Sequence, residues 1–242
     1  MTRRFFVEHS LATGTATLVG AEAHHVAHVL RVRVGDQLTL FDGSGREVLA
    51  QVTQIGRHEI ELSAGQPQDV DRELSSAVTL GVALPKGERQ RWLVEKLVEL
   101  GTTRLVPLIT TRAVAQPGQN TLGRLRRAVI EASKQSGRNR LMEVDQPRRL
   151  ADYLDSTPDS AIRWLAHHGG SPWNAAQVGT GPVFCAIGPE GGFTDDEMNA
   201  SAQAGWQIVN LGRRILRVET AAVAISASLS VQLDRRHDSS TS

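Results

Sequence analysis

The hydrophobic pattern changes about a third of the way along the chain, which indicates two differently built parts. In the first part, short runs of alternating apolar and polar residues predict strands, and the spacing over 22–32 predicts one helix. Glycine-rich turns separate the strands. Several short strands joined by tight turns favour a small barrel. The predicted strands cover 4–8, 37–41, 48–55 and 59–63.

From residue 78 onward the pattern alternates between strands and helices, which is typical of a mostly parallel sheet with helices on both faces. Trp92, Leu93, Leu97 and Leu100 form the apolar face expected for the first of these helices. The predicted strands are 78–84, 105–109, 161–166, 183–187 and 208–211, and the helices are 88–100, 122–136 and 220–233.

The polar segment 64–71 contains Pro and Gly and predicts a linker between the two parts. We therefore expect one domain over 1–70, a second over 71–236, and a disordered polar tail over 237–242.

Composition narrows the class of protein. Hydrophobic residues make up 40% of the 242 and charged residues 22%, as in globular proteins, and no apolar run has the length of a membrane span. The N-terminus lacks the apolar core of a signal peptide. The one cysteine, Cys185, leaves no internal disulfide, which suits the cytoplasm, and its apolar strand predicts a packing role.

Positive charge is concentrated in the middle of the chain. The formal net charge is +1, but residues 71–150 hold 15 Lys or Arg against 8 Asp or Glu. Between Arg112 and Arg140 the only acidic residue is Glu131. Such a patch is compatible with contact to RNA phosphates and equally with solvated helix faces.

Two glycine-rich segments carry the strongest functional signal. Residues 187–193 (IGPEGGF) follow an apolar strand and precede Thr194-Asp195-Asp196-Glu197, which predicts a capping box at the start of a helix. Residues 211–221 (LGRRILRVETA) repeat this strand, loop and helix layout. Bare-backbone loops at the end of parallel strands are typical of ligand sites in α/β sheets, so we expect both loops to converge on one ligand.

Several common sites are not indicated. The chain has neither the G-x-G-x-x-G dinucleotide motif nor a G-x-x-x-x-G-K-[ST] phosphate loop, which argues against NAD and ATP. His24 and His25 are adjacent, so on a helix they point about 100° apart and do not face one metal ion. We expect no metal site; one of this pair is expected to be buried and the other near RNA.

The chain resembles the RsmE family, SPOUT-class methyltransferases that act on N3 of a uridine in 16S ribosomal RNA. The similarity extends over nearly the full length and includes both glycine-rich segments. Other matching segments are Arg4-Phe5-Phe6, His24-His25, Val29-Leu30-Arg31, Asp42-Gly43, Glu99-Leu100-Gly101 and Ser133-Lys134-Gln135-Ser136-Gly137-Arg138.

The resemblance implies an N-terminal PUA-like β-barrel, a C-terminal α/β domain with a trefoil knot, and a homodimer. It also implies that S-adenosylmethionine (SAM) is the methyl donor and that 16S rRNA, within the small ribosomal subunit, is the substrate. SAM carries no phosphate and requires backbone contacts and apolar walls. The implied cofactor-binding residues are His167, Gly188, Pro189, Glu190, Gly191, Gly192, Leu211, Gly212, Ile215 and Leu216.

Arg217 is the candidate catalytic residue, because it lies in the second segment and an arginine can stabilise the anion formed when uridine loses its N3 proton. Alternatively, Arg217 pairs with Glu219 or binds an RNA phosphate. Glu219 is expected to cap the last helix, whereas the role of Glu190 and the general base stay open. The candidate RNA-binding residues are Arg3, Arg4, His25, Arg31, Arg112, Lys134 and Arg138. Alternative functions are a non-catalytic ribosome-assembly factor and another SPOUT RNA methyltransferase.

Overall fold

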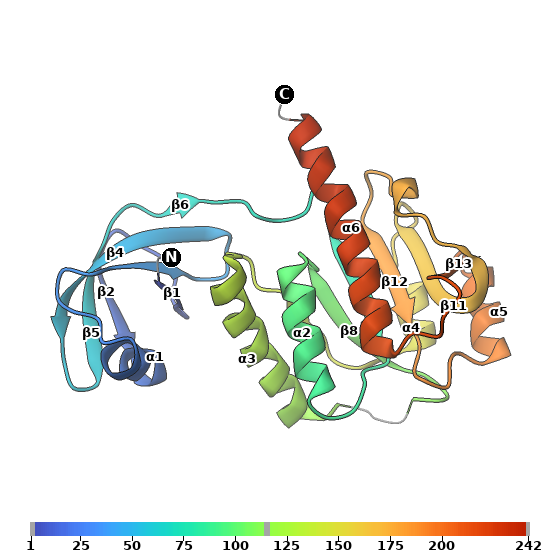
Figure 1. The fold of residues 1–242 in the computed structure, drawn as a ribbon, viewed down its shortest axis with the longest axis horizontal. Coiled ribbons are helices and arrows are strands. Elements are labelled where there is room, and N and C mark those ends of the chain that lie inside the picture. Colours follow the sequence, from blue (N-terminus) through green and yellow to red (C-terminus); the bar gives the residue numbers. More distant parts are fainter. Residues whose placement is uncertain (1–2, 114–116, 241–242) are drawn as a thin grey trace. The chain divides into compact units, whose positions relative to one another are not determined.

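The structure, a computed structural model, describes residues 3–113 and 117–240 (Figure 1). The chain forms two compact units. One contains residues 1–73 and 133–141, and the other contains 74–132 and 142–242. The chain returns to the first unit at residues 133–141. The expected division between residues 70 and 71 does not include this segment in the first unit.

The first unit is built on one six-stranded sheet with the order β1-β3-β4-β5-β2. β1 runs parallel to β3, the remaining neighbours are antiparallel, and β6 pairs with β4. Apolar side chains from β3, β4 and β5 are buried in a single core. The elements are β1 Arg3–Phe6, β2 Gly14–Val19, α1 Gly20–His24, the π-helical turn η1 His25–Val29, β3 Gln37–Phe41, β4 Arg46–Ile55, β5 Glu59–Ala64 and β6 Gln68–Asp69.

Two features of this unit differ from the sequence expectations. β2 was not predicted, because Leu18 is its only buried residue and the alternating signal is weak. The expected helix over 22–32 is shorter: it changes to π geometry at His25, and Arg31 takes a left-handed φ of 50°. A π turn and a positive φ in a non-glycine residue are both uncommon in regular structure.

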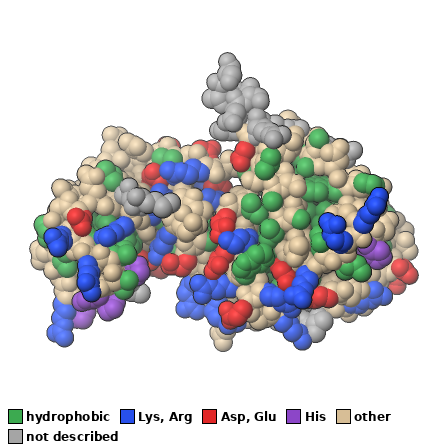
Figure 2. Space-filling model, in the orientation of Figure 1, with side chains coloured by type: hydrophobic (Ala, Val, Ile, Leu, Met, Phe, Trp, Pro, Cys, Tyr) green, Lys and Arg blue, Asp and Glu red, His purple; other side chains and the backbone are tan. Residues whose placement is uncertain are grey.

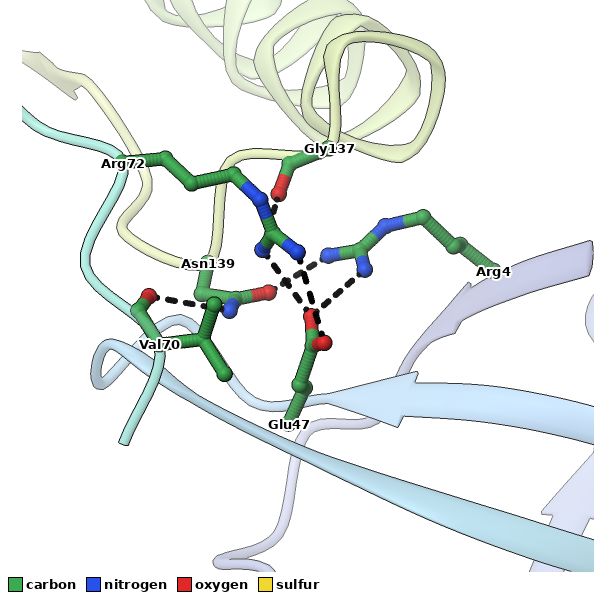
Figure 3. A network of polar contacts seen from close by, with 6 residues as sticks. All are labelled: Arg4, Glu47, Val70, Arg72, Gly137 and Asn139. Carbon is green, nitrogen blue, oxygen red and sulfur yellow. Dashed lines mark hydrogen bonds and ion pairs between the residues drawn. The ribbon is translucent and has the colours of Figure 1, made fainter. Parts of the chain in front are cut away.

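A polar network centred on Glu47 attaches the returning segment to the sheet of the first unit (Figure 3). Arg4 donates to the Glu47 carboxylate at 2.7 Å, and Arg72 donates to it at 3.0 Å. Arg4 also donates to Asn139, whose amide donates to the Val70 carbonyl at 3.2 Å. Burial alone would raise the pKa of Glu47, but the hydrogen bonds from Arg72, Arg4 and Asn139 outweigh it and hold the pKa at about 2.

We predict that Glu47→Gln destabilises the first unit in a pH-dependent way. The folded-state pKa lies below the ordinary value of 4.5, so the stabilisation is complete above that value and is lost as the pH falls towards 2. Its size is on the order of 2–3 kcal/mol. Hydrogen exchange of β4 amides should show the variant opening more readily at pH 7, with the difference narrowing by pH 3. An equal difference at both pH values would contradict this account.

The second unit is a parallel sheet with the order β10-β8-β7-β12-β11-β13, and β9 pairs with β8. Among the described residues, neighbouring strands of this sheet run parallel. Its strands are β7 Val78–Val82, β8 Arg104–Ile109, β9 Glu143–Val144, β10 Arg148–Arg149, β11 Ile162–Pro172, β12 Val183–Ile187 and β13 Gln207–Asn210. Its helices are α2 Arg89–Glu99, α3 Gln119–Ser136, α4 Leu150–Asp155, η2 Ala175–Gln177, α5 Asp195–Gln203 and α6 Val218–Ser240.

Helices cover both faces of this sheet, as predicted (Figure 1). α4 packs with α5 on one face, where Tyr153 lies in the core with Trp206 and Phe193. α2 packs with α6 on the other face. The Tyr153 hydroxyl donates to the Cys185 carbonyl at 3.1 Å, and burial raises the pKa values of both side chains. Cys185 is therefore a packing residue, as expected.

Two features of the second unit differ from the sequence expectations, and a third stays a prediction. Trp92 is 44% exposed, so it does not belong to the buried face of α2, which consists of Gln90, Leu93, Val94, Leu97 and Val98. Residues 237–240, expected in a disordered tail, form the end of α6, and 241–242 lie outside the described residues. The trefoil knot stays a prediction.

Candidate active site

The carboxyl ends of the parallel strands surround one cavity of about 270 Å³. The loop after β12 (188–193) and the loop after β13 (211–217) form two of its sides. β11 contributes Ala166, His167 and His168, and the segment after β8 contributes Arg112. The expected convergence of the two glycine-rich segments is therefore present in the structure. All ten candidate cofactor residues line the cavity: His167, Gly188, Pro189, Glu190, Gly191, Gly192, Leu211, Gly212, Ile215 and Leu216.

Glycine is required in each loop by backbone geometry. Gly192 has a φ of 69° and Gly212 a φ of 116°, both in the region that side chains disfavour. No atom lies within 4 Å of the position that a Cβ would take at either residue. Glycine is therefore needed for the backbone conformation and not for lack of space. The space beside the backbone at both residues is open.

The first loop is held at its carboxyl end by the predicted capping box. Thr194 accepts from the Glu197 amide at 3.2 Å, and the Glu197 carboxylate accepts from the Thr194 amide at 2.8 Å. The other carboxylate oxygen accepts from the Thr111 amide at 2.8 Å. Burial opposes ionisation, but the hydrogen bonds from Thr111 and Thr194 outweigh it and lower the pKa of Glu197. One carboxylate thus connects the start of α5 with the segment after β8.

Arg112 holds the same loop from the cavity side. Its guanidinium donates to the Gly191 carbonyl at 2.8 Å and to the Phe193 carbonyl at 3.3 Å. Sequence reasoning placed Arg112 on the RNA surface. The structure shows that it lines the cavity and binds the backbone of the first glycine-rich loop.

The surroundings of His167 in the cavity wall favour the neutral form of its ring. Its Nδ1 accepts from the Gly169 amide at 3.2 Å, so the neutral ring carries its proton on Nε2. Burial lowers the pKa of His167, the neighbouring His168 lowers it further, and Asp195 acts in the opposite direction. An uncharged ring can face a cationic ligand without electrostatic repulsion.

The remaining walls are apolar or formed by backbone. Ile215 is 92% exposed although it is a large aliphatic residue, and Leu211 and Leu216 are partly buried beside it. This apolar surface is therefore available for contact with a ligand in the cavity. Arg214 also lines the cavity. Arg217, the expected catalytic residue, does not line it, and its exposed side chain makes no ion pair among the described residues.

Arg89 at the start of α2 connects the acidic residues of both glycine-rich segments. Its Nη1 lies 3.5 Å from a carboxylate oxygen of Glu190 and 3.3 Å from one of Glu219. Glu219 is in the first turn of α6, as expected, but its observed partner is Arg89 and not Arg217 or the helix amides. Sequence reasoning missed Arg89, because nothing in the linear pattern relates α2 to loops 100 residues away.

Three candidate RNA-binding residues form ion pairs within the first unit. Arg4 pairs with Glu47, and Lys134 pairs with Glu22. Arg138 is 4% exposed and binds the Glu73 carboxylate through two nitrogens. A buried and paired guanidinium does not face RNA, which corrects the expectation for Arg138.

Arg3, His25 and Arg31 are exposed, as an RNA contact requires. His24 is exposed as well, which corrects the expectation that one of the adjacent histidines is buried. The His24 and His28 rings are 4.6 Å apart. Figure 2 shows histidine side chains gathered with Lys or Arg on the part of the first unit that carries α1.

Within residues 3–113 and 117–240, no group of three metal-ligating side chains lies together. None of the helices in these ranges combines the length and apolarity needed to cross a membrane.

Comparisons with known proteins agree with this architecture. The RNA methyltransferase domain family matches residues 72–230, and the RNA methyltransferase PUA domain matches residues 18–64. Ribosomal RNA small subunit methyltransferase E from Synechocystis is 33% identical over 226 residues, covering 91% of this chain and 74% of that protein. The chain belongs to the RsmE family of RNA methyltransferases.

Solved structures of related proteins support the same fold. The RsmE structure from Neisseria gonorrhoeae, bound to SAM, has a TM-score of 0.89 at 32% identity, covering 96% of this chain and 98% of that one. A methyltransferase from Legionella pneumophila, also with bound SAM, has a TM-score of 0.87 at 30% identity, covering 96% and 98%. The predicted pairing of a parallel α/β unit with an N-terminal PUA-like domain is thereby confirmed.

We predict that Arg112→Met loosens the first glycine-rich loop. The substitution removes the charged hydrogen bonds to the Gly191 and Phe193 carbonyls. The Gly192 amide, which donates to the Pro189 carbonyl at 2.8 Å, should then exchange with solvent several-fold faster. Arg124→Met, on α3, is the matched control and should leave this amide unchanged. Equal exchange rates in wild type and Arg112→Met would refute the role given to Arg112.

Proposed function

We propose that this protein is a SAM-dependent methyltransferase that modifies N3 of a uridine in 16S rRNA during maturation of the small ribosomal subunit. The observation that carries the proposal is the single cavity formed by both glycine-rich loops. Support comes from relatives named as ribosomal RNA small subunit methyltransferase E and from two similar structures that contain SAM.

The residues of the cavity fit SAM. The bare backbone of both loops can bind the edge of an adenine, and Leu211, Ile215 and Leu216 offer apolar walls for its faces. The lowered pKa of His167 favours an uncharged ring, which does not repel the sulfonium charge. When bound there, SAM supplies an electrophilic methyl group, and the protein's own residues position it and exclude water.

The direct test is methyl transfer from labelled SAM to small ribosomal subunits or 16S rRNA isolated from a strain that lacks this protein. We expect one methyl group per rRNA, located on N3 of a uridine by mass mapping. SAM binding without any transfer would contradict the enzymatic proposal. No SAM binding in a folded protein would favour an assembly factor without catalysis.

We predict that Ile215→Ser weakens SAM binding about 10-fold or more without destabilising the protein. The side chain is 92% exposed, so its loss costs little in the unliganded fold, whereas covering it with a ligand contributes roughly 1.5–3 kcal/mol. Isothermal titration and thermal unfolding measure the two effects separately. Val231→Ser, an exposed apolar residue of α6, serves as the control. Unchanged affinity in Ile215→Ser would show that this wall is not used.

Methylation at N3 requires loss of the N3 proton, which leaves negative charge on the O2–N3–O4 system of uracil. A nearby arginine can stabilise this charge without itself changing protonation state. The cavity favours Arg214 for this role over Arg217, because Arg214 lines it and Arg217 does not. Arg214 thus replaces Arg217 as the proposed catalytic arginine.

We predict that Arg214→Ala lowers the rate of methyl transfer at saturating SAM by about 100-fold, since removing one donor to a developing anion costs roughly 3 kcal/mol. SAM affinity should change by less than a factor of three. Arg217→Ala should retain most of the activity. The assignment fails if Arg217→Ala loses the larger share, or if Arg214→Ala loses SAM binding and not the rate.

Arg3, His25 and Arg31 of the first unit are the proposed RNA contacts that the structure leaves exposed. Phosphate contacts from such residues would make RNA affinity fall steeply with salt concentration. The homodimer implied by the family resemblance and the cytoplasmic location inferred from the single cysteine belong to this proposal as well.

A further inference from the structure

A second cavity of about 200 Å³ lies next to the proposed SAM site. It opens at the carboxyl end of β7 and the start of α2. Pro189 and Glu190 line both cavities, so these two residues of the first glycine-rich loop form a shared boundary. The other residues that line the second cavity are Ala83, Leu84, Lys86, Arg89 and Ala113.

The second cavity combines cations with apolar walls. Lys86 is exposed and has no ion pair or hydrogen bond among the described residues. Arg89 is oriented by the buried Glu219 at 3.3 Å and by Glu190 at 3.5 Å. Leu84, Ala113 and Pro189 supply small apolar surfaces. Lys86 suits a phosphate, because Arg89 is already paired with two carboxylates. The apolar surfaces suit the face of a base.

Glu190 gives this cavity an acceptor at its boundary with the SAM site. Its side chain is 48% exposed, and among the described residues it pairs with Arg89. A carboxylate accepts hydrogen bonds and donates none, so it binds the N3–H of uracil favourably. Cytosine has no proton on N3 and presents a lone pair there, which a carboxylate repels.

We propose that the second cavity binds the target uridine nucleotide, with its phosphate at Lys86 and its N3–H at Glu190. This inference rests on the proposed function, because it places the methyl acceptor beside the methyl donor. The shared wall is consistent with reaction between two ligands in adjacent cavities. Arg89 is a positioning residue, which holds Glu190 towards the boundary while Glu219 anchors it.

The proposal gives the N3 proton an acceptor. The N3–H bond breaks and its proton passes to the Glu190 carboxylate, leaving the electron pair on N3. N3 then forms a bond to the methyl carbon of SAM as the carbon–sulfur bond breaks, and the sulfur leaves as the neutral thioether S-adenosylhomocysteine. Glu190 later releases its proton to water. No oxidant or further reactant is needed.

Binding of uridine 5′-monophosphate tests the phosphate contact without any catalysis. We expect NMR titration of the wild type to show saturable binding, weakened at least five-fold by Lys86→Met. Lys96→Met is the matched control, because Lys96 lies on α2, pairs with Glu99 and is absent from the cavity lining. Equal affinity in wild type and Lys86→Met, or an equal loss in Lys96→Met, would overturn the proposal.

Base discrimination tests Glu190. The wild type should bind uridine 5′-monophosphate at least five-fold more tightly than cytidine 5′-monophosphate, and Glu190→Gln should abolish most of this preference because an amide can also donate. A preference unchanged in Glu190→Gln would refute the contact. These equilibrium measurements do not involve SAM. A protein that binds uridine 5′-monophosphate as described but not SAM would therefore refute the proposed function and leave this nucleotide site standing.

Discussion

The parallel direction of the strands in the second unit is the constraint on which the site depends. Parallel strands place all their carboxyl ends at one edge of a sheet, so loops distant in sequence become neighbours. The loops after β7, β8, β12 and β13 reach this edge, where they meet the middle of β11 at Ala166, His167 and His168. Neither glycine-rich loop encloses a ligand alone. The parallel sheet brings the two loops together, and together they form the cavity.

Three charged side chains then fix the loops in position. Arg112 binds carbonyls of the first loop, and Glu197 connects its end to the segment after β8. Arg89 links the first loop to the start of α6 through Glu190 and Glu219. Hydrogen bonds to charged groups are stronger than neutral ones and hold geometry well. The glycines of the first loop can therefore expose their backbone to a ligand while the loop stays ordered.

The sequence indicates the two loops that line the cavity because their signals are local. A continuous apolar run predicts β12, a 3.6-residue period predicts α2, and the capping box at Thr194 is confirmed. The features that the sequence does not predict depend on contacts between residues far apart in the chain. The burial of Arg138 by Glu73 and the exposure of Trp92 follow from packing that no linear pattern records. For the same reason, a run of basic residues was interpreted as an RNA surface although some of its members are structural.

The most direct test of the account is a crystal structure with S-adenosylhomocysteine, which keeps the nucleoside and amino-acid parts of the cofactor. The account predicts electron density for this compound in the cavity between residues 188–193 and 211–217, with backbone of both segments contacting the nucleoside and Ile215 covered by it. Density at another place, or a compound that touches only one of the two loops, would contradict the claim that the paired loops form a single cofactor site.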